Sequence, residues 1–143
     1  MNARVLRAET PGQVARCFAV MRVLRTELAA VEPFVEQVIR QQAQGYQLAL
    51  LEVDGEVRAV AGFRISENLA WGRFLYVDDL VTRSVDRSLG RGRMIFDWLI
   101  AEARAAGCGQ LHLDSGVQRF DAHRFYLMQR MHISSHHFAL KLT

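Results

Sequence analysis

The fold is decided by the stretch Leu80-Val81-Thr82-Arg83-Ser84-Val85-Asp86-Arg87-Ser88-Leu89-Gly90-Arg91-Gly92-Arg93-Met94. In it an apolar strand runs into a short polar turn with two closely spaced glycines, and a helix follows directly. The first turn of a helix favours acidic side chains, because the helix N-terminus carries roughly half a positive charge. Here the opening carries arginines instead, and the first acid inside the helix is Asp97. Cations gathered at the positive end of a helix indicate that an anion binds among them.

Gly90 and Gly92 make the start of this helix a suitable anion site. The first N–H groups of a helix have no partner within it, and glycines leave them accessible to a ligand. We therefore interpret the turn as a phosphate cradle, with positive charge from the arginines at positions 83, 87, 91 and 93. It is neither a P-loop, which needs a Lys-Ser/Thr pair, nor the dinucleotide fingerprint, which needs a third glycine.

The composition is that of a soluble globular chain, and we expect one domain over residues 1–143. Half of the residues are hydrophobic, 23% are charged, and the net charge is +3. This charge is too small to indicate a nucleic-acid or membrane-surface partner, so we expect neither. Cys17 and Cys108 have no CxxC spacing, and no apolar run approaches the ~18 residues of a membrane span. With no signal-peptide pattern at the N-terminus, we expect a reduced protein in the cytoplasm.

Two helices are predicted near the N-terminus. A short candidate strand, Val5–Ala8, precedes Thr10-Pro11-Gly12-Gln13, which has the pattern of a capping box with proline at the first helical position. Apolar residues at three- and four-residue spacing carry this helix to Leu28. A second helix is predicted from Pro33 to a stop at Gly45.

Three strand-like runs follow these helices, at 46–53, 56–65 and 73–82. Asp54-Gly55 joins the first two and is a strong signal for a two-residue hairpin. Residues 66–72 are predicted to be a loop. Trp71 within it either packs on the loop or forms a lid over a ligand.

The C-terminal part alternates helices and strands. The helix after the glycine turn ends at Ala106-Gly107, a strand is predicted at 110–114, and Asp121 is a good N-cap for a helix to Arg130. A last strand is predicted from Ile133 to Leu142. A strand, a helix and a strand with short connections form a crossover unit, so the strands at 73–82 and 110–114 should be parallel. We therefore predict an α/β fold with a mixed sheet and helices on both faces.

The motif Arg87-Ser88-Leu89-Gly90-Arg91-Gly92 resembles the Q/R-x-x-G-x-G/A signature of the GNAT superfamily of N-acetyltransferases. Asp79–Thr82 resembles the strand before that signature, and Ala122-His123-Arg124-Phe125-Tyr126 resembles its late helix. Within the superfamily, the run 121–127 is most similar to small bacterial enzymes acting on primary amines, including aminoalkylphosphonate acetyltransferases. The resemblance covers essentially the whole chain. It implies a mixed, mostly antiparallel sheet of about six to seven strands, with about four helices on its two faces.

The resemblance implies acetyl-CoA as co-substrate, with its pyrophosphate on the backbone N–H groups of Leu89–Arg93. It also implies a bulge in the strand at 77–82, beside which the pantetheine arm lies. The Leu80 N–H is expected to polarise the thioester carbonyl. The cofactor-binding residues so predicted are Leu80, Val81, Thr82, Arg87, Ser88, Leu89, Gly90, Arg91, Gly92, Arg93 and Arg119. Because Arg119 stands where relatives often have asparagine, its contacts are expected to differ from theirs.

Acetyl transfer to an amine needs a neutral amine, so a general base is expected, because free alkyl amines are protonated at neutral pH. Asp78 and Asp79 lie in mid-strand, where acids are depleted. Neighbouring strand residues face opposite sides, so one of them can face the acceptor, and Asp78 is favoured. The alternative is that these acids bind a substrate ammonium or a nearby arginine. Tyr126 matches the family position for the acid that protonates the leaving thiolate; the alternative is a core aromatic.

The predicted function is transfer of an acetyl group from acetyl-CoA to a primary amine of a small molecule, by direct attack in a ternary complex. A non-catalytic acyl-CoA-binding module and a protein or peptide acetyltransferase are the alternatives. Arg25, Arg40 and Arg119 are candidates to hold an acidic group of the acceptor. A homodimer is a further expectation, from exposed edges and a C-terminal strand. The five histidines do not converge in a zinc pattern, and no metal is expected.

Overall fold

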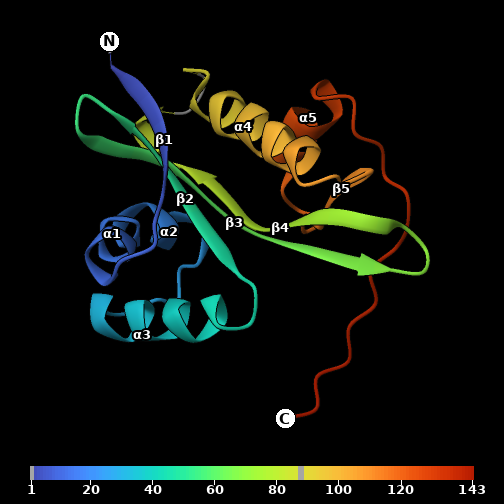
Figure 1. Cartoon of the computed structure of the whole chain (residues 1–143), viewed down its shortest axis with the longest axis horizontal. Helices are drawn as coiled ribbons and strands as arrows, with labels where there is room; N and C mark the ends of the chain where they lie inside the picture. Colours follow the sequence, from blue (N-terminus) through green and yellow to red (C-terminus); the bar gives the residue numbers. More distant parts are fainter. Residues whose placement is uncertain (1, 87–88) are drawn as a thin grey trace. The chain divides into compact units, whose positions relative to one another are not determined.

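The structure, a computed structural model, describes residues 2–86 and 89–143 (Figure 1). The chain divides into two compact units, Met1–His112 and Leu113–Thr143. The predicted α/β class is confirmed, with a five-stranded sheet in the order β1-β2-β3-β4-β5. The strands are β1 (Ala3–Arg7), β2 (Gln47–Val53), β3 (Glu56–Asn68), β4 (Gly72–Thr82) and β5 (Gln110–Leu113). The sheet has five strands, where six to seven were predicted.

The first four strands form an antiparallel meander, as the hairpin signals predicted. Asp54 and Gly55 both adopt positive φ, 52° and 83°, and this matches the twist of the strands that they join. The next hairpin is longer than predicted, because β3 continues to Asn68 and leaves three residues, 69–71, for its turn. The glycine-turn helix, α4 (Arg91–Ala105), then connects β4 to its neighbour β5.

The helix predicted from Thr10 to Leu28 is in fact two helices, α1 (Pro11–Arg16) and α2 (Phe18–Leu24). Thr10 and Gln13 form the predicted capping box. The chain bends at Cys17, whose N–H donates to Val14 O at 3.0 Å, three residues back, and so tightens the last turn of α1. Cys17 is fully buried at this bend, so both short helices keep their apolar side chains on the sheet.

The sheet is covered on both faces within the first unit (Figure 1). On one side lie α1, α2 and α3 (Val31–Gln42), and on the other lies α4. Apolar side chains of the N-terminal helices pack with Leu48, Leu50, Val60 and Val81 of the sheet. On the opposite side, α4 buries Ile95, Phe96, Leu99 and Ala103. The middle strands are therefore apolar on both faces, and polar side chains among them need a specific explanation.

Trp71, which was predicted either to pack or to form a lid, packs. Its indole stacks on the imidazole of His112 in β5, with ring centroids 3.5 Å apart and planes 10° from parallel. Phe74 meets the indole edge-on at 5.0 Å. The backbone N–H of Trp71 donates to Asn68 Oδ1 at 2.7 Å, so side chains hold the turn at both of its ends.

The second unit contains α5 (Phe120–Met128), followed by residues 131–143 with no helix or strand. The prediction of a strand from Ile133 to Leu142 is therefore wrong for the single chain. A strand exists only with a neighbour to complete its hydrogen bonds, and an alternating apolar pattern does not supply one. Helix α5 begins two residues earlier than predicted. Asp121 thus lies in its first turn, where it pairs with Arg124, and Arg119 takes the N-cap position.

Candidate active site

The predicted bulge lies in β4, at Asp78. Gly62 pairs with Asp79 and the next residue, Phe63, pairs with Val77, so Asp78 is an extra residue without a partner on β3. Gly62 is required at this point, because a Cβ there would lie 1.8 Å from the hydroxyl of Tyr46. The missing side chain lets Tyr46 cross β3 and reach the bulge.

Asp79 is held on both of its carboxylate oxygens. The Tyr46 hydroxyl donates to Oδ2 at 2.7 Å, and Arg25 Nε donates to Oδ1 at 2.8 Å. Arg25 also donates, through Nη2, to the backbone carbonyl of Asp78 at 2.8 Å. The Arg25 guanidinium, at the end of α2, thus connects that helix to the bulge. It also provides a hydrogen-bond donor for the Asp78 carbonyl at the point where the strand ladder is interrupted.

Asp78 has a different environment. Among the described residues its carboxylate receives one side-chain hydrogen bond, from Arg64 Nε to Oδ2 at 2.9 Å. Burial raises the pKa of Asp78, and the charge of Asp79 adds to the rise, while the hydrogen bond and charge of Arg64 oppose it. The net result is a carboxyl group that holds its proton more strongly than a free aspartate. Its side chain keeps 23% of its surface exposed, so it is accessible to a ligand.

The expected alternation of Asp78 and Asp79 does not hold at the bulge. The Arg64 guanidinium, which binds Asp78, lies over the ring of Tyr46 at 5.4 Å from its centroid, and Tyr46 binds Asp79. Both acids therefore lie on the side of Tyr46: Asp79 accepts from its hydroxyl, and Asp78 binds the guanidinium that lies over its ring. They share this side because the extra residue shifts the register between them. The alternative that these acids bind nearby arginines is observed for both, with Arg25 and Arg64 as the partners.

The strand after the bulge contains the first three predicted cofactor residues. Val81 is buried among the side chains of the N-terminal helices, whereas Leu80 and Thr82 are half-buried. Regular pairing of Leu80 with Ala61 and of Thr82 with Ala59 puts these two residues on the face opposite Val81. The Val81 side chain thus belongs to the core, and any contact that Val81 makes with a ligand is through its backbone.

A buried carboxylate anchors the segment that leads to the glycine turn. Asp86, in a single turn of 3-10 helix (Ser84–Asp86), is 2% exposed. It accepts from Arg58 Nη1 at 2.9 Å and from Arg83 Nε at 2.5 Å, and Glu56 lies 3.1 Å from the Arg83 guanidinium. Burial alone would raise the pKa of Asp86, but the two arginines outweigh it and hold the pKa below its usual range.

The glycine turn itself has the predicted geometry where it is described. Arg87 and Ser88 lie outside the described residues. Gly90 takes the N-cap position with φ 80°, and as a glycine it has no side chain with which to cap the helix start. The first turn, from Arg91 through Gly92 and Arg93, has no acidic residue. With basic side chains and backbone N–H groups at the positive end of a 15-residue helix, the donor set fits an anionic group such as a pyrophosphate.

Tyr126 and Arg119 belong to the second unit, and they interact there. Burial raises the pKa of the Tyr126 hydroxyl, while the charge of Arg119 and its side-chain hydrogen bond to Tyr126 act in the opposite direction. Tyr126 is therefore not a simple apolar filler, since its hydroxyl has a cationic partner. Arg119, predicted as a cofactor ligand, is a neighbour of the predicted acid.

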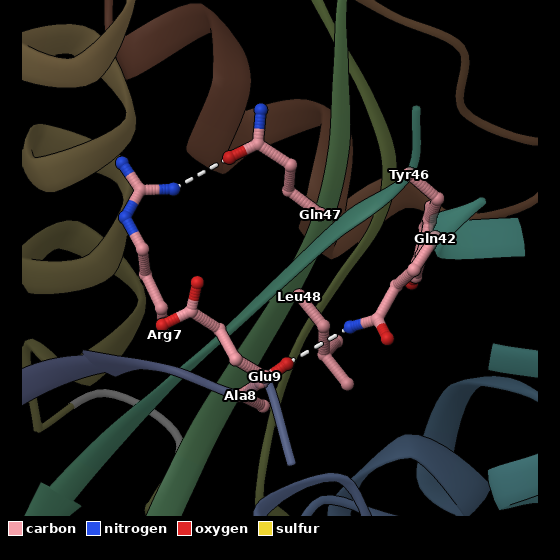
Figure 2. Close-up of a pocket in the computed structure, with 7 residues that line it drawn as sticks. All are labelled: Arg7, Ala8, Glu9, Gln42, Tyr46, Gln47 and Leu48. Carbon is pink, nitrogen blue, oxygen red and sulfur yellow. Dashed lines mark hydrogen bonds between the residues drawn. The ribbon is translucent and has the colours of Figure 1, made fainter. Parts of the chain in front are cut away.

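In the first unit, a cleft of about 250 Å³ lies between the end of β1 and the start of β2 (Figure 2). It is lined by Arg7, Ala8, Glu9, Gln42, Tyr46, Gln47 and Leu48. Gln42 Nε2 donates to Ala8 O at 2.9 Å and Arg7 Nη1 donates to Gln47 Oε1 at 2.5 Å (Figure 2). None of the predicted site residues that the structure describes lines this cleft, but Tyr46 is part of its wall and also binds Asp79.

Comparisons with known proteins identify the family. The Acetyltransferase (GNAT) family profile matches residues 17–131. The chain belongs to the GNAT acetyltransferase family. It is 38% identical over 113 residues to the uncharacterized N-acetyltransferase YhdJ of Bacillus subtilis, covering 78% of this chain and 79% of that protein. The chain is thus an N-acetyltransferase, of a family that uses acetyl-CoA.

Solved structures show the same fold at low sequence identity. A protein described as a transcriptional regulator from Bacillus halodurans superposes with a TM-score of 0.85 at 19% identity, covering 99% of this chain and all of that one. Glucosamine-6-phosphate N-acetyltransferase from Arabidopsis thaliana gives 0.76 at 18% identity over the whole of both chains. AAC(6')-Iy, in complex with the bisubstrate analogue CoA-S-monomethyl-acetylneamine, gives 0.83 at 9% identity, covering 100% and 99%.

Three residues of the site were missed in the sequence: Tyr46, Gly62 and Arg64. Tyr46 and Arg64 have the pattern of ordinary strand residues, and Gly62 falls inside an apolar run. A glycine inside a strand is a known signal for a bulge or a close approach, and it could have been used. Among the described residues, no group of His, Cys, Asp and Glu is arranged to hold a metal ion, and no helix is long and apolar enough to cross a membrane.

Proposed function

We propose that this N-acetyltransferase transfers an acetyl group from acetyl-CoA to a primary amine of a small molecule, with both substrates bound at once. The observation that carries the proposal is the β4 bulge, where Asp78 has a raised pKa and a partly exposed carboxylate on the same strand that leads to the proposed anion site at the helix start. The chain is proposed to act as one acetyltransferase domain, and its two free cysteines favour a reducing, cytoplasmic location.

The helix start and the end of β4 are proposed to hold acetyl-CoA, which supplies the acetyl group as an activated thioester. Backbone N–H groups from Leu89 to Arg93 bind the pyrophosphate, and arginines 87, 91 and 93 supply its counter-charge. Ser88 belongs to the same turn. The backbone groups of Leu80, Val81 and Thr82 position the arm, and the Leu80 N–H stabilises the developing negative charge on the carbonyl oxygen.

Asp78 is proposed as the general base. An alkyl ammonium must lose a proton before its nitrogen can attack, and a carboxylate with a raised pKa accepts that proton better than an ordinary one. Asp79 is saturated by Tyr46 and Arg25, so its role is to fix the bulge. Tyr126 is proposed to protonate the leaving thiolate, with the cationic Arg119 stabilising the tyrosinate that remains after the transfer.

Two measurements test the proposal. Calorimetry with acetyl-CoA should show saturable binding to the chain and none to Gly92→Glu, which places a carboxylate in the anion site. Release of free thiol across a panel of small amines should identify an acceptor. With that acceptor, Asp78→Asn should lower kcat by roughly 100-fold or more, and Tyr126→Phe should lower kcat while leaving acetyl-CoA affinity unchanged.

The outcome decides between the proposal and its alternatives. A folded chain that does not bind acetyl-CoA at high micromolar concentration would refute the whole assignment. Tight binding without any acceptor, unchanged in the Asp78 and Tyr126 variants, would identify a binding or sensing module. Acetylation of peptides but of no small-molecule amine would indicate that the acceptor is a protein or peptide.

A further inference from the structure

The segment between β4 and α4 is fixed by one buried residue. Residues 84–86 form a single 3-10 turn, and α4 begins at Arg91. Among the described residues of the range 84–90, Asp86 alone is buried, whereas the apolar Val85 and Leu89 are exposed. Apolar packing therefore does not hold this segment in place. Because ordering a backbone costs conformational entropy, another interaction must fix it.

The carboxylate of Asp86 connects the segment to the sheet. It accepts from Nη1 of Arg58, in β3, at 2.9 Å and from Nε of Arg83, directly after β4, at 2.5 Å. Backbone bonds follow the same path, since the Arg83 N–H donates to Arg58 O at 2.8 Å and the Asp86 N–H donates to Arg83 O at 3.0 Å. Glu56 lies 3.1 Å from the Arg83 guanidinium and 3.5 Å from that of Arg58. Two acids thus balance two arginines, so the cluster holds the segment rather than attracting an anion.

The connection continues into the glycine turn. The Asp86 carbonyl accepts from the Leu89 N–H at 3.2 Å, and Gly90 follows as the N-cap of α4. Glycine restricts the backbone less than any other residue, and here it supplies no capping side chain. The direction in which the helix start presents its N–H groups therefore depends on what holds the residues before it. Asp86 is the described residue that does so.

We propose that Asp86 is a positioning residue for acetyl-CoA. Its carboxylate holds the glycine turn in the conformation that presents the first N–H groups of α4 to the pyrophosphate, and it acts through the turn rather than by contact with the cofactor. The inference rests on the proposed acetyl-CoA site. A turn that is ordered before binding avoids the entropic cost of ordering it on binding, so loss of the Asp86 carboxylate should weaken the affinity.

Charge and positioning predict opposite effects of neutralising Asp86. A carboxylate near an anion site repels the ligand, so its removal should strengthen acetyl-CoA binding if charge alone matters. Removal of the charge that two arginines share should weaken binding if the turn is thereby released. The sign of the change in affinity therefore separates the two.

Calorimetry with acetyl-CoA on the whole chain, in the cold, tests the inference. We expect the Kd of Asp86→Asn to rise by about tenfold. The matched control is Glu52→Gln in β2, because Glu52 is the other buried acid in the described part of the chain. It also binds two arginines, Arg4 at 2.5 Å and Arg16 at 2.7 Å, and neither belongs to the Asp86 cluster. This control should lose stability and keep the wild-type Kd, and circular dichroism confirms that each variant is folded.

Arg58→Lys is the second variant and decides the question if Asp86→Asn does not fold. Lysine keeps the charge but offers a single nitrogen to two acids in place of a planar fork, so the Kd should rise by about threefold. A wild-type chain that does not bind acetyl-CoA would overturn the inference together with the proposed function. Binding that Gly92→Glu abolishes, but that the Asp86 or Arg58 variant leaves unchanged or strengthens, would overturn the inference alone. An equal loss of affinity in Glu52→Gln would do the same.

Discussion

Replacing Asp86 by asparagine should destabilise the protein more than any other single charge neutralisation in the part of the chain that the structure describes. Asp86 is the most buried of the acids there, at 2% exposure, and receives hydrogen bonds from Arg58 at 2.9 Å and Arg83 at 2.5 Å. A hydrogen bond to a charged group contributes about 1.5–3 kcal/mol. Asparagine keeps one acceptor oxygen but loses the charge, so we expect a loss of about 2–3 kcal/mol.

Alanine at the same position should cost more, about 3–5 kcal/mol, because both arginines then lose the carboxylate that they share. Glu56 limits the loss, since it stays within 3.1 Å of Arg83 and 3.5 Å of Arg58. Urea titration followed by circular dichroism measures the change. The control is Asp97→Asn, whose pair with Arg93 is 3.7 Å long and exposed on both sides, and which should cost less than about 1 kcal/mol.

The stabilisation by Asp86 also has a defined pH dependence. Its folded-state pKa is lowered, so the contribution is present above the unfolded value of about 3.9 and is lost as the pH falls through the folded value. The difference between wild type and Asp86→Asn should therefore be constant near neutrality and shrink below about pH 4. Equal stability of the two proteins at pH 7, or a gap that widens in acid, would refute this account of the network.

Three further outcomes follow from the site. Gly62→Ala should cost about 1–3 kcal/mol in urea titration, because the new Cβ would lie 1.8 Å from the Tyr46 hydroxyl, whereas Gly12→Ala, with open space around it, should cost nothing. Arg64→Gln should raise the pKa of Asp78 further and move the acid limb of the pH profile of kcat/KM upward; an unmoved limb would exclude Asp78 as the base. Burial raises the pKa of the Cys17 thiol to about 12. At pH 8 the folded protein should therefore react with one equivalent of a thiol reagent, at Cys108, and with two equivalents only when unfolded.

The sequence was sufficient for the features that depend on local chemistry. A few neighbouring residues determine each of three such features: the capping box at Thr10 and Gln13, the hairpin at Asp54-Gly55, and the glycine start of α4. The proposed anion site rests on the same kind of local reasoning, because arginines at a helix start conflict with the helix dipole unless an anion is bound. Features of this kind need no knowledge of distant contacts.

Features that depend on contacts with other parts of the chain were predicted less well. The break at Cys17 leaves the apolar spacing of a single helix unchanged, so periodicity does not reveal it. Ile133–Leu142 has the alternation of a strand but pairs with no strand in the described part of the chain. Alternation indicates which side chains share a face, not whether a neighbouring strand exists. Arg119 was assigned by its place in a motif, and the contact it makes is with Tyr126, seven residues later.

The two adjacent acids of β4 show why the site itself could be predicted only in part. Two carboxylates inside a strand buried on both faces are costly, and this marks them as functional. The regular two-residue period then assigns them to opposite faces, which is wrong here because the period is interrupted at Asp78. The interruption is stabilised by Gly62 and Tyr46, which lie 16 residues apart in the sequence and meet in space. Asp79 is held by hydrogen bonds from Arg25 and Tyr46, whereas burial raises the pKa of Asp78 and the charge of Asp79 adds to the rise. The acid that stabilises the bulge and the acid proposed for proton transfer are therefore distinguished by their hydrogen-bond partners, which only the folded chain assembles.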